Sequence, residues 1–397
     1  MQLADRLKPL SSNVFADMDR AKGKAIAQGK TIIDLSLGSS DLPTQQPTLD
    51  AISKSLQDPN THGYLLHNGT REFRETAAQW YEARFKIAVN PETEVLALIG
   101  SQEGTAHLPL AILNPGDYAL LLDPGYPSHA GGVYLAEGQI HTMPLLAANK
   151  FLPVFADIPQ EILAQAKMMV LSYPHNPTAG TATLSFFQET VAFCRKHNLV
   201  LVHDFPYVDM VFTGATKPPS ILQADPSKER SIEFFTLSKS YNMGGFRVGY
   251  AIGNPELITA LKQIKAVVDF NQYRGILNGA IAALNSPQSM VEETVKIFEK
   301  RRDSLIAALH KIGWQVAKPD ATMYLWAKLP SKWQQDSITF CTQLVAQTGV
   351  ALSPGAGFGR SGEGYVRFAL VKEPAILESA VTKIAKFLES NSSKDSC

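Results

Sequence analysis

The chain has 397 residues, too many for one simple hydrophobic core but suited to two or three lobes of ~100–200 residues each. Hydrophobic residues make up 45% and charged residues 19%, which is an ordinary globular composition. Lys and Arg together number 37, as do Asp and Glu, and this zero net charge argues against nucleic acid or an anionic membrane as the main partner.

The cysteines and the first residues predict a cytoplasmic protein. Cys194, Cys341 and Cys397 are scattered, odd in number and without metal-ligand spacing, so we expect reduced thiols and no metal site. The first twenty residues carry charges throughout and lack the apolar stretch of a signal sequence. No run approaches the ~20 apolar residues that a membrane helix needs, so we expect no membrane contact.

In chain order, an N-terminal arm comes first and is followed by a series of short apolar runs. We expect the arm, residues 1–44, to pack against the C-terminal lobe. The apolar runs lie at residues 94–100, 118–122, 140–145, 168–173, 199–205, 232–237 and 246–253. Most are apolar at successive positions rather than at alternate ones, as is typical of strands covered on both faces.

Amphipathic segments lie before, between and after these runs and predict helices. They cover residues 70–85, 185–198 and 255–268, and the second begins with Ser185 and Gln188, a Ser-x-x-Gln pattern that predicts a capping box. Strands that alternate with helices in this way indicate an α/β fold. We expect a mostly parallel seven-stranded sheet with helices on both faces, forming a large domain over residues 45–285.

The pattern changes past about residue 285. A long charged amphipathic helix leads into "WQVAKPDATMYLWAKL" (314–329), which reads as two antiparallel strands around a turn. A helix, the strand "GYVRFALV" (364–371) and a final helix follow. We interpret residues 286–397 as a smaller α+β domain, to which the N-terminal arm adds a part.

Polar side chains follow five of the predicted strands. In open parallel sheets, ligands bind at the carboxyl ends of the strands. At those ends the sequence places an amide, an acid, two phenols, a lysine and a serine-containing turn: Ser101 and Gln102, Tyr126, Asn176, Asp204 with Tyr207, and Ser238 with Lys239. We therefore expect these side chains to meet at one edge of the sheet.

This set of side chains is what a pyridoxal phosphate (PLP) site requires. A lysine binds the cofactor covalently, and an acid keeps the ring nitrogen protonated so that the ring draws electrons. An arginine and a helix N-terminus with small hydroxyl residues bind the phosphate. Lys239 and Arg247 fit the first and last of these tasks, with Gly244 and Gly245 allowing the backbone between them to turn.

The motifs resemble, in order, those of the class I/II aminotransferases of fold type I. "SKSYNMGGFRVGY" resembles the family's lysine signature, "NPTAG" its Asn-Pro-Thr-Gly motif apart from Ala179, and "DFPY" its Asp-x-x-Tyr. "YLLHNGTREFRE" resembles the family's Tyr…Gly…Leu-Arg block, and "YVRFAL" its substrate-arginine strand. The resemblance spans residues 34–370, and "DLSLGSSDLP" looks most like the LL-diaminopimelate and aspartate aminotransferase branch.

The resemblance implies a role for each matched residue. Lys239 carries PLP covalently and moves the proton, Asp204 pairs with the ring nitrogen, and Tyr207 completes the catalytic set. Gly38, Asn176 and Arg367 bind the substrate, whose α-carboxylate suits the planar fork of Arg367. The implied cofactor-binding residues are Ser101, Gln102, Tyr126, Asn176, Asp204, Tyr207, Thr236, Ser238, Lys239 and Arg247, together with Tyr64 from a partner subunit.

Residues 267–277 depart from the family pattern. In this region, relatives send a loop into the partner's active site. We therefore treat Asn271, Gln272, Tyr273 and Arg274 as candidates for contacting the far end of the substrate. Arg274 is the expected substrate-binding residue among them.

The implied activity is ping-pong transfer of an amino group between an L-amino acid and a 2-oxo acid, in a homodimer with shared active sites. Glutamate or aspartate is the expected donor. A PLP-dependent β-lyase or decarboxylase on the same fold is the alternative that the motifs leave open. A ligand sensor on this scaffold would require an additional basic helix-turn-helix segment, and the zero net charge argues against one. A dehydrogenase would require G-x-G-x-x-G after its first strand, and the sequence lacks this motif there. The sequence does not identify the substrate.

Overall fold

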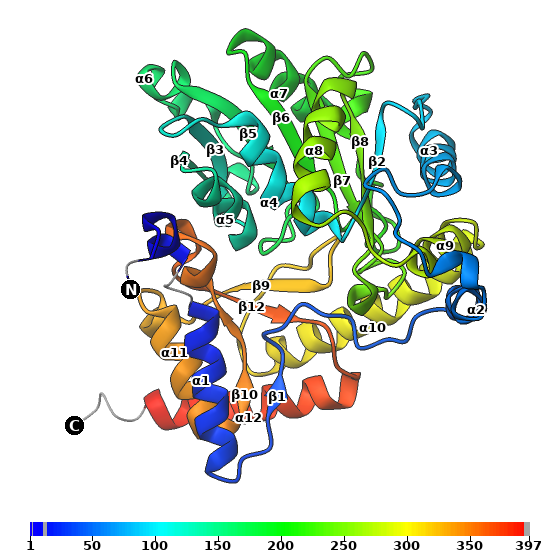
Figure 1. Ribbon diagram of the computed structural model, residues 1–397. Helices are drawn as coiled ribbons and strands as arrows, with labels where there is room; N and C mark the ends of the chain where they lie inside the picture. Colours follow the sequence, from blue (N-terminus) through cyan, green and yellow to red (C-terminus); the bar gives the residue numbers. More distant parts are fainter. Residues whose placement is uncertain (2, 11–13, 393–397) are drawn as a thin grey trace.

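A computed structural model of the chain describes residues 1, 3–10 and 14–392, and its centre is a seven-stranded sheet (Figure 1). The strand order is β2-β8-β7-β6-β5-β3-β4. The strands are β2 (Val95–Leu98), β3 (Tyr118–Asp123), β4 (Gln139–Pro144), β5 (Ala166–Leu171), β6 (Val200–Asp204), β7 (Ser231–Thr236) and β8 (Gly249–Gly253). Only β8 runs against its neighbours, which confirms the mostly parallel sheet.

The sheet is covered on both faces. Every residue of β2, β7 and β8 is buried, which explains why their sequences are apolar at successive positions. On one face, the strands and their covering helices form a core cluster separate from the main core of the molecule. The helices of this part are α2 (Gln46–Leu56), α3 (Arg71–Phe85), α4 (Ser101–Ile112), α5 (Pro127–Leu135), α6 (Gln160–Leu163), α7 (Leu184–Lys196), α8 (Pro255–Val268) and α9 (Arg274–Leu284).

A second, smaller sheet lies below the large one in Figure 1. Its antiparallel strands have the order β11 (Ser353–Pro354), β12 (Tyr365–Ala369), β9 (Tyr324–Lys328). The N-terminal segment is joined to this part, because β1 (Ile33–Asp34) pairs with β10 (Val350–Ala351) and α1 (Val14–Ala27) contacts α11 (Ser337–Thr348). The remaining helices are α10 (Gln288–Lys311) and α12 (Pro374–Ser392). The domain boundaries at residues 44 and 285 stay a prediction.

The predicted strand pair over residues 314–329 is wrong. Only β9 forms there, and its partner is β12 rather than the preceding segment. Pro319 interrupts that segment and has no N–H for a ladder. Ala321 forms only an isolated bridge to Val211, and the Trp314 indole instead donates a hydrogen bond to the Lys328 carbonyl, at 2.7 Å.

The predicted capping box at the start of α7 is also wrong. The helix begins one residue before Ser185, and Thr183 is its N-cap: the Thr183 hydroxyl accepts a hydrogen bond from the Phe186 N–H at 3.2 Å. Thr183 satisfies this N–H because its extended backbone directs the hydroxyl toward the first turn. The sequence offers two adequate caps, and the earlier one begins the helix.

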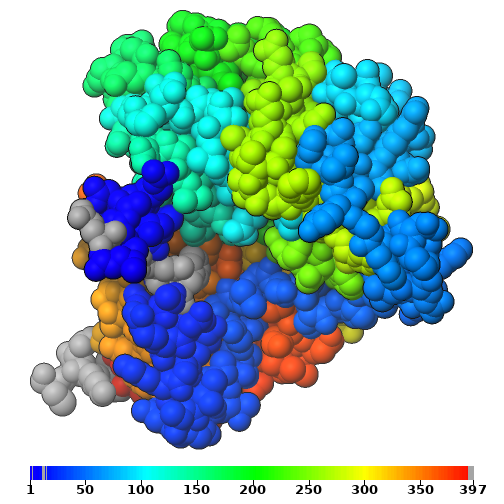
Figure 2. Space-filling model, in the orientation of Figure 1, coloured from blue at the N-terminus to red at the C-terminus, as the bar shows by residue number. Residues whose placement is uncertain are grey.

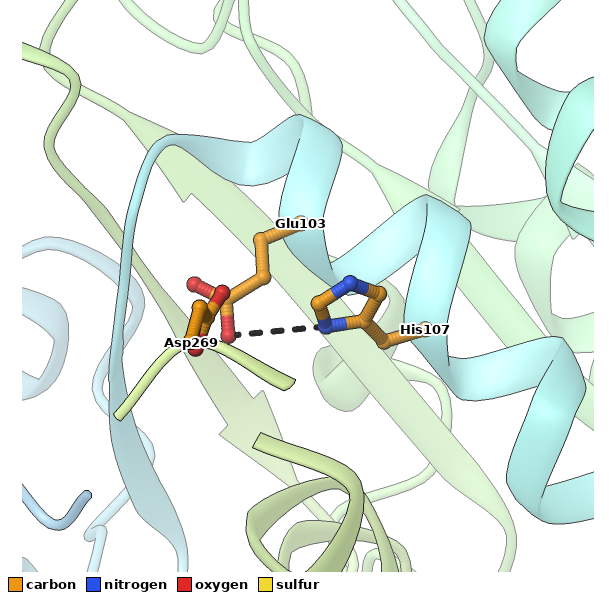
Figure 3. A group of neighbouring side chains, drawn as sticks. All are labelled: Glu103, His107 and Asp269. Carbon is orange, nitrogen blue, oxygen red and sulfur yellow. Dashed lines mark ion pairs between the residues drawn. The ribbon is translucent and has the colours of Figure 1, made fainter. Parts of the chain in front are cut away.

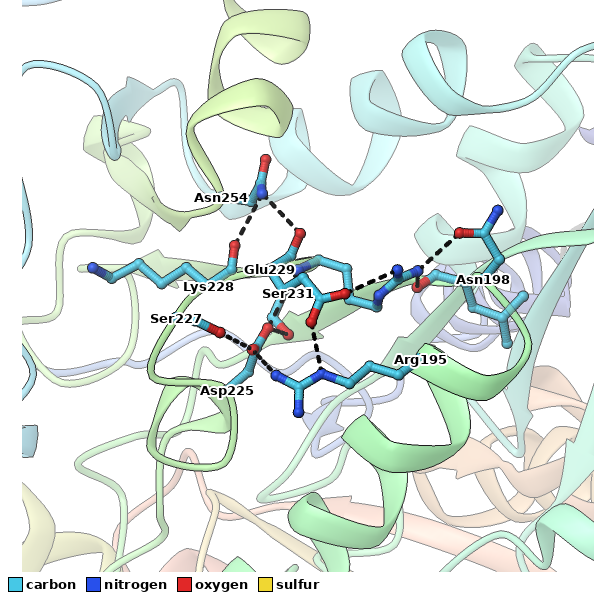
Figure 4. A network of polar contacts seen from close by, with 10 residues as sticks. Arg195, Asn198, Asp225, Ser227, Lys228, Glu229, Ser231 and Asn254 are labelled. Carbon is cyan, nitrogen blue, oxygen red and sulfur yellow. Dashed lines mark hydrogen bonds and ion pairs between the residues drawn. The ribbon is translucent and has the colours of Figure 1, made fainter.

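A polar network holds the amino end of β7 (Figure 4). Asp225 is fully buried and accepts hydrogen bonds from Arg195 at 2.8 Å and from the Ser231 hydroxyl at 2.7 Å. Asn254, the N-cap of α8, binds the carbonyls of Lys228 and Glu229. The loop before β7 is thereby fixed to α7 and α8, at the end of the strand opposite Lys239. None of the helices described is long and apolar enough to cross a membrane.

Candidate active site

A cavity of about 490 Å³ lies at the carboxyl ends of the large sheet's strands, with the small sheet contributing Tyr324 and Arg367. It brings together nearly all of the predicted site residues from segments far apart in the sequence. The predicted residues that line it are Gly38, Ser101, Gln102, Tyr126, Asn176, Asp204, Tyr207, Thr236, Ser238, Lys239, Arg247 and Arg367.

Lys239 lies in the turn that follows β7. Its Nζ donates a hydrogen bond to the Gly38 carbonyl at 2.6 Å, so it points toward the N-terminal segment that closes the cavity. Gly38 itself has no room for a side chain, because an added Cβ would lie 1.9 Å from the Tyr324 hydroxyl oxygen. Close approach of Tyr324 therefore requires a glycine at position 38.

Asp204 ends β6 and is buried at the floor of the cavity. Its Oδ2 lies 3.0 Å from His129 Nε2, whereas its Oδ1 is buried without a hydrogen-bond partner. A buried carboxylate oxygen without a partner is costly, so this oxygen marks a place for a ligand donor. The protonated ring nitrogen of PLP is such a donor, and Asp204 fits it.

The N-terminus of α4 and Arg247 form a positive region beside the cavity. Gly100 precedes α4 with a φ of 75°, and a Cβ there would lie 2.6 Å from Arg247 Nη2. The guanidinium thus packs directly on the turn that exposes the first N–H groups of α4. Helix N–H groups and an arginine together favour a phosphate. Thr236 and Ser238, whose hydroxyls are 2.9 Å apart, line the same cavity.

Arg367 is buried on β12 and faces the cavity. Its guanidinium donates to Asn176 Oδ1 at 2.8 Å and to the Ser36 carbonyl at 2.7 Å, and it stacks on the Tyr324 ring at 4.2 Å. Its Nε is buried without a hydrogen-bond partner. A guanidinium held in this way, with a donor to spare, suits a carboxylate.

Two phenols link the arginine to the rest of the site. The Tyr207 hydroxyl donates to the Tyr324 hydroxyl at 2.9 Å. Burial acts to raise the pKa of Tyr324, but the positive charges of Arg367 and Lys239 bring that pKa below its usual value. Burial, with Tyr324 as neighbour, raises the pKa of Tyr207. Tyr207 therefore stays a neutral donor.

The structure adds residues to the site that the sequence analysis missed. His129 comes from α5, Tyr324 from β9 and Phe358 from the loop before β12, and α1 contributes Asp19 and Lys22. Tyr324, Asp19 and Lys22 lie outside the matched motifs. The "PGYPSHA" stretch, in which His129 follows Tyr126 by three residues, is the one local signal that could have pointed to His129.

Tyr64 and Arg274 do not line this cavity. Tyr64 is 98% exposed, and its ring lies 6.3 Å from that of Phe270. Arg274 begins α9. The expected role of Tyr64 is in the site of a partner subunit, so one chain does not test it, and the roles of both residues stay predictions.

Three potential metal ligands cluster between α4 and the end of α8: Glu103 and His107 lie on α4, and Asp269 follows α8 (Figure 3). The cation among them is Lys265, whose Nζ lies 2.9 Å from both Glu103 oxygens and 3.2 Å from Asp269 Oδ1. A metal ion would have to displace this fully buried ammonium. Glu103 Oε2 also accepts the Ile99 N–H, so the cluster fastens the first turn of α4.

Comparison with known proteins places the chain in a family. The family model described as "Aminotransferase class I and II" matches residues 30–384. An LL-diaminopimelate aminotransferase from Dehalococcoides mccartyi is 42% identical over 387 residues, which are 98% of this chain and 99% of that protein.

Two solved structures are similar over nearly the whole chain. A probable N-succinyldiaminopimelate aminotransferase from Thermus thermophilus has a TM-score of 0.89 and 42% identity, covering 94% of this chain and 99% of that one. Substrate-bound BacF from Bacillus subtilis has a TM-score of 0.93 and 33% identity, covering 98% of each chain. The chain therefore belongs to the class I and II aminotransferases, a PLP-dependent family of fold type I.

Proposed function

We propose that this aminotransferase acts on LL-diaminopimelate and a 2-oxo acid such as 2-oxoglutarate, by a ping-pong mechanism. The names of its relatives support the substrate. The proposed chemistry rests on one observation: Lys239, Asp204 with its unpartnered Oδ1, and the guanidinium of Arg367 line the same cavity. The β-lyase or decarboxylase alternative is not favoured, because the relatives are named aminotransferases.

In this proposal, PLP is held by groups that the cavity already presents. Lys239 carries it covalently, and Asp204, oriented by His129, pairs with its ring nitrogen. Tyr126 would stack on the ring, while Asn176 and Tyr207 would contact the ring hydroxyl. Ser101, Gln102, Thr236, Ser238 and Arg247, which line the cavity, would hold the phosphate. When bound, PLP withdraws electrons from the α-carbon of the amino acid.

The chain's own residues then orient the amino acid and move its proton. Arg367 binds the α-carboxylate, with Asn176 fixing one edge of the guanidinium. The Gly38 backbone closes on the same carboxylate. Once the amino group of the substrate has displaced it from the cofactor, the Lys239 amine, which faces the Gly38 carbonyl, would take up the α-proton and return it on the cofactor side. Burial of Asp204 and Arg367 keeps water away from these charges.

We also propose a homodimer in which each site is completed by the partner. Support comes from exposed apolar side chains on two adjacent segments, 64–66 and 267–270. The blue segment near residue 64 lies beside the yellow-green end of α8 in Figure 2, and the Tyr64–Phe270 contact joins them. Exposed apolar side chains that lie on adjacent segments in this way are typical of an interface. The cytoplasmic location expected from the sequence stays a prediction.

The test measures where the amino group of the donor goes. Purified protein loaded with PLP is given LL-diaminopimelate and 2-oxoglutarate, and glutamate formation is measured together with pyruvate and ammonia. We expect glutamate in step with consumption of the donor, and neither pyruvate nor ammonia. Release of ammonia without glutamate would show the lyase alternative. Borohydride reduction followed by peptide mapping should mark Lys239, and a mark on another lysine would contradict the assigned site.

A further inference from the structure

One wall of the cavity belongs to α1, the first helix of the chain. This wall consists of Met18, Asp19 and Lys22, and the Lys22 side chain is 17% exposed whereas that of Asp19 is 71% exposed. No role in the proposed function uses these two charges. An opposite pair of charges at the edge of a substrate cavity is a natural contact for a polar group at the far end of the substrate.

Two carboxylates hold Lys22 in place, the partly buried Asp34 and the exposed Asp19. Its Nζ lies 2.9 Å from Asp34 Oδ2 and 2.7 Å from Asp19 Oδ1. Asp34 is fixed in turn, because its Oδ1 accepts hydrogen bonds from the Ser36 N–H and hydroxyl. Burial acts to lower the pKa of Lys22, but the hydrogen bonds that Lys22 donates to Asp19 and Asp34 outweigh it and raise that pKa. Lys22 is therefore an ammonium at neutral pH.

The same backbone segment connects Lys22 to the substrate arginine. Ser36 binds Asp34 through its N–H and Arg367 through its carbonyl. Lys22 and Arg367 therefore approach one cavity from the two ends of residues 34–36. A molecule whose carboxylate lies on Arg367 and which extends toward α1 approaches the wall that contains Lys22 and Asp19.

The Asp19–Lys22 pair can open to admit a ligand. Asp34 remains as a partner for Lys22, whereas Asp19 is mostly in water and its ion pair is of the weak exposed kind. The pair can thus be replaced by two ligand contacts without leaving either charge unpaired. A ligand group that is itself zwitterionic matches it, since it returns one opposite charge to each residue.

We propose that Asp19 and Lys22 recognise the far end of a substrate that carries both an ammonium and a carboxylate there. Lys22 binds the distal carboxylate and Asp19 the distal ammonium. LL-diaminopimelate has this arrangement, because each of its ends bears an amino group and a carboxylate. The inference rests on the proposed function and deepens it by assigning the residues that select the substrate.

The experiment compares three amino donors in the single-turnover half-reaction of the PLP-loaded enzyme. LL-diaminopimelate has both distal charges, L-2-aminopimelate has only the distal carboxylate, and L-lysine has only the distal ammonium. Lys22→Met should lower kcat/KM about tenfold or more for the first two donors and less than about twofold for L-lysine. Asp19→Asn should lower it for LL-diaminopimelate and L-lysine but not for L-2-aminopimelate.

Asp17→Asn and Lys24→Met are the matched controls, because both residues lie on α1 but do not line the cavity. They should leave all three values unchanged. Equal losses for all donors in Lys22→Met, or no loss in either variant, would overturn the inference. So would loss of the LL-diaminopimelate preference in Arg274→Ala with Lys22→Met unaffected. A wild-type enzyme that uses other donors but not LL-diaminopimelate would instead refute the proposed function.

Discussion

Asp204 has one oxygen bound by His129 and one that is buried without a partner. Asp204→Asn keeps the shape of the side chain but removes the negative charge that would hold a proton on the ring nitrogen. We expect kcat/KM to fall on the order of a hundredfold or more. The measurement is kcat/KM at saturating PLP, with bound PLP determined by absorbance. A fully loaded variant of near wild-type activity would contradict the role of Asp204.

Local motifs predicted most of the residues that line the cavity. They did not indicate the residues that reach the site only through tertiary contacts. Asp204, Asn176 and Lys239 each follow an apolar run, so a strand-end argument finds them. His129 and Tyr324 enter the site because α5 and β9 are placed against β6 and β12, and no spacing in the sequence encodes that distance. Sequence reasoning therefore locates side chains at the ends of parallel strands better than those supplied by neighbouring elements.

At the scale of elements, the junction of β2 and α4 is a place where backbone shape serves ligand binding. Gly100 has a φ of 75°, and an alanine Cβ would lie 2.6 Å from Arg247 Nη2. Gly100→Ala should strain the backbone by about 1–2 kcal/mol and also displace Arg247. We expect the dissociation constant of PLP to rise about tenfold or more, because a charge-assisted contact to the phosphate is lost.

Gly116→Ala separates these two effects. Gly116 has a φ of 90° with nothing within 4 Å of an added Cβ, so its substitution brings strain without a displaced neighbour. Both variants should lower the melting temperature of the protein without PLP. Only Gly100→Ala should weaken PLP binding, as measured by fluorescence or absorbance titration. Equal PLP affinities in the two variants would mean that Arg247 does not hold the phosphate.

The loop before β7 gives a prediction about pH. Burial acts to raise the pKa of Asp225, but hydrogen bonds from Ser231 and the backbone, with Arg195 nearby, lower that pKa overall. A lowered carboxyl pKa stabilises the fold above the unfolded pKa of about 3.9 and loses this effect as the pH falls through the folded pKa. Asp225→Asn should therefore cost about 1–3 kcal/mol near neutral pH and progressively less below about pH 4.

The measurement is the free energy of unfolding in urea as a function of pH, for the wild type and Asp225→Asn. Asp157→Asn is the control, since Asp157 is exposed. A difference that stays constant down to about pH 2 would show that the charge of Asp225 does not stabilise the loop. Activity at neutral pH should be retained, because the network lies at the first residue of β7, Ser231, whereas Lys239 follows the last.

The strands of the large sheet were predictable because most of them are buried on both faces, which leaves apolar runs that differ from their surroundings. The edge strand β4 is the exception, since most of its residues are exposed or half-buried. The small sheet was less so. Its strand β12 was predicted, but the partner of β9 was not, because antiparallel pairing between residues 324–328 and 365–369 joins segments far apart in sequence. Short strands such as β10 and β11, of two residues each, leave no pattern to recognise.

At the scale of the whole molecule, the proposed dimer predicts that two impaired variants restore activity when they are combined in one dimer. If Tyr64 completes the site of the partner, Lys239→Ala and Tyr64→Ala should each be impaired as homodimers. A mixed dimer has one site in which Lys239 and the partner's Tyr64 are both intact. Random reassortment makes half of the dimers mixed, so activity should recover to about a quarter of the wild-type value in the mixture and to about half in the purified mixed dimer.

The mixed dimer is obtained by unfolding and refolding equal amounts of the two variants with different affinity tags, and it is purified by both tags in turn. Its activity per site is compared with that of each parent carried through the same procedure. Activity no higher than the mean of the parents would mean that Tyr64 acts within its own chain or not at all. Because Tyr64 is 98% exposed and does not line its own cavity, recovery in the mixed dimer has no explanation within a single subunit.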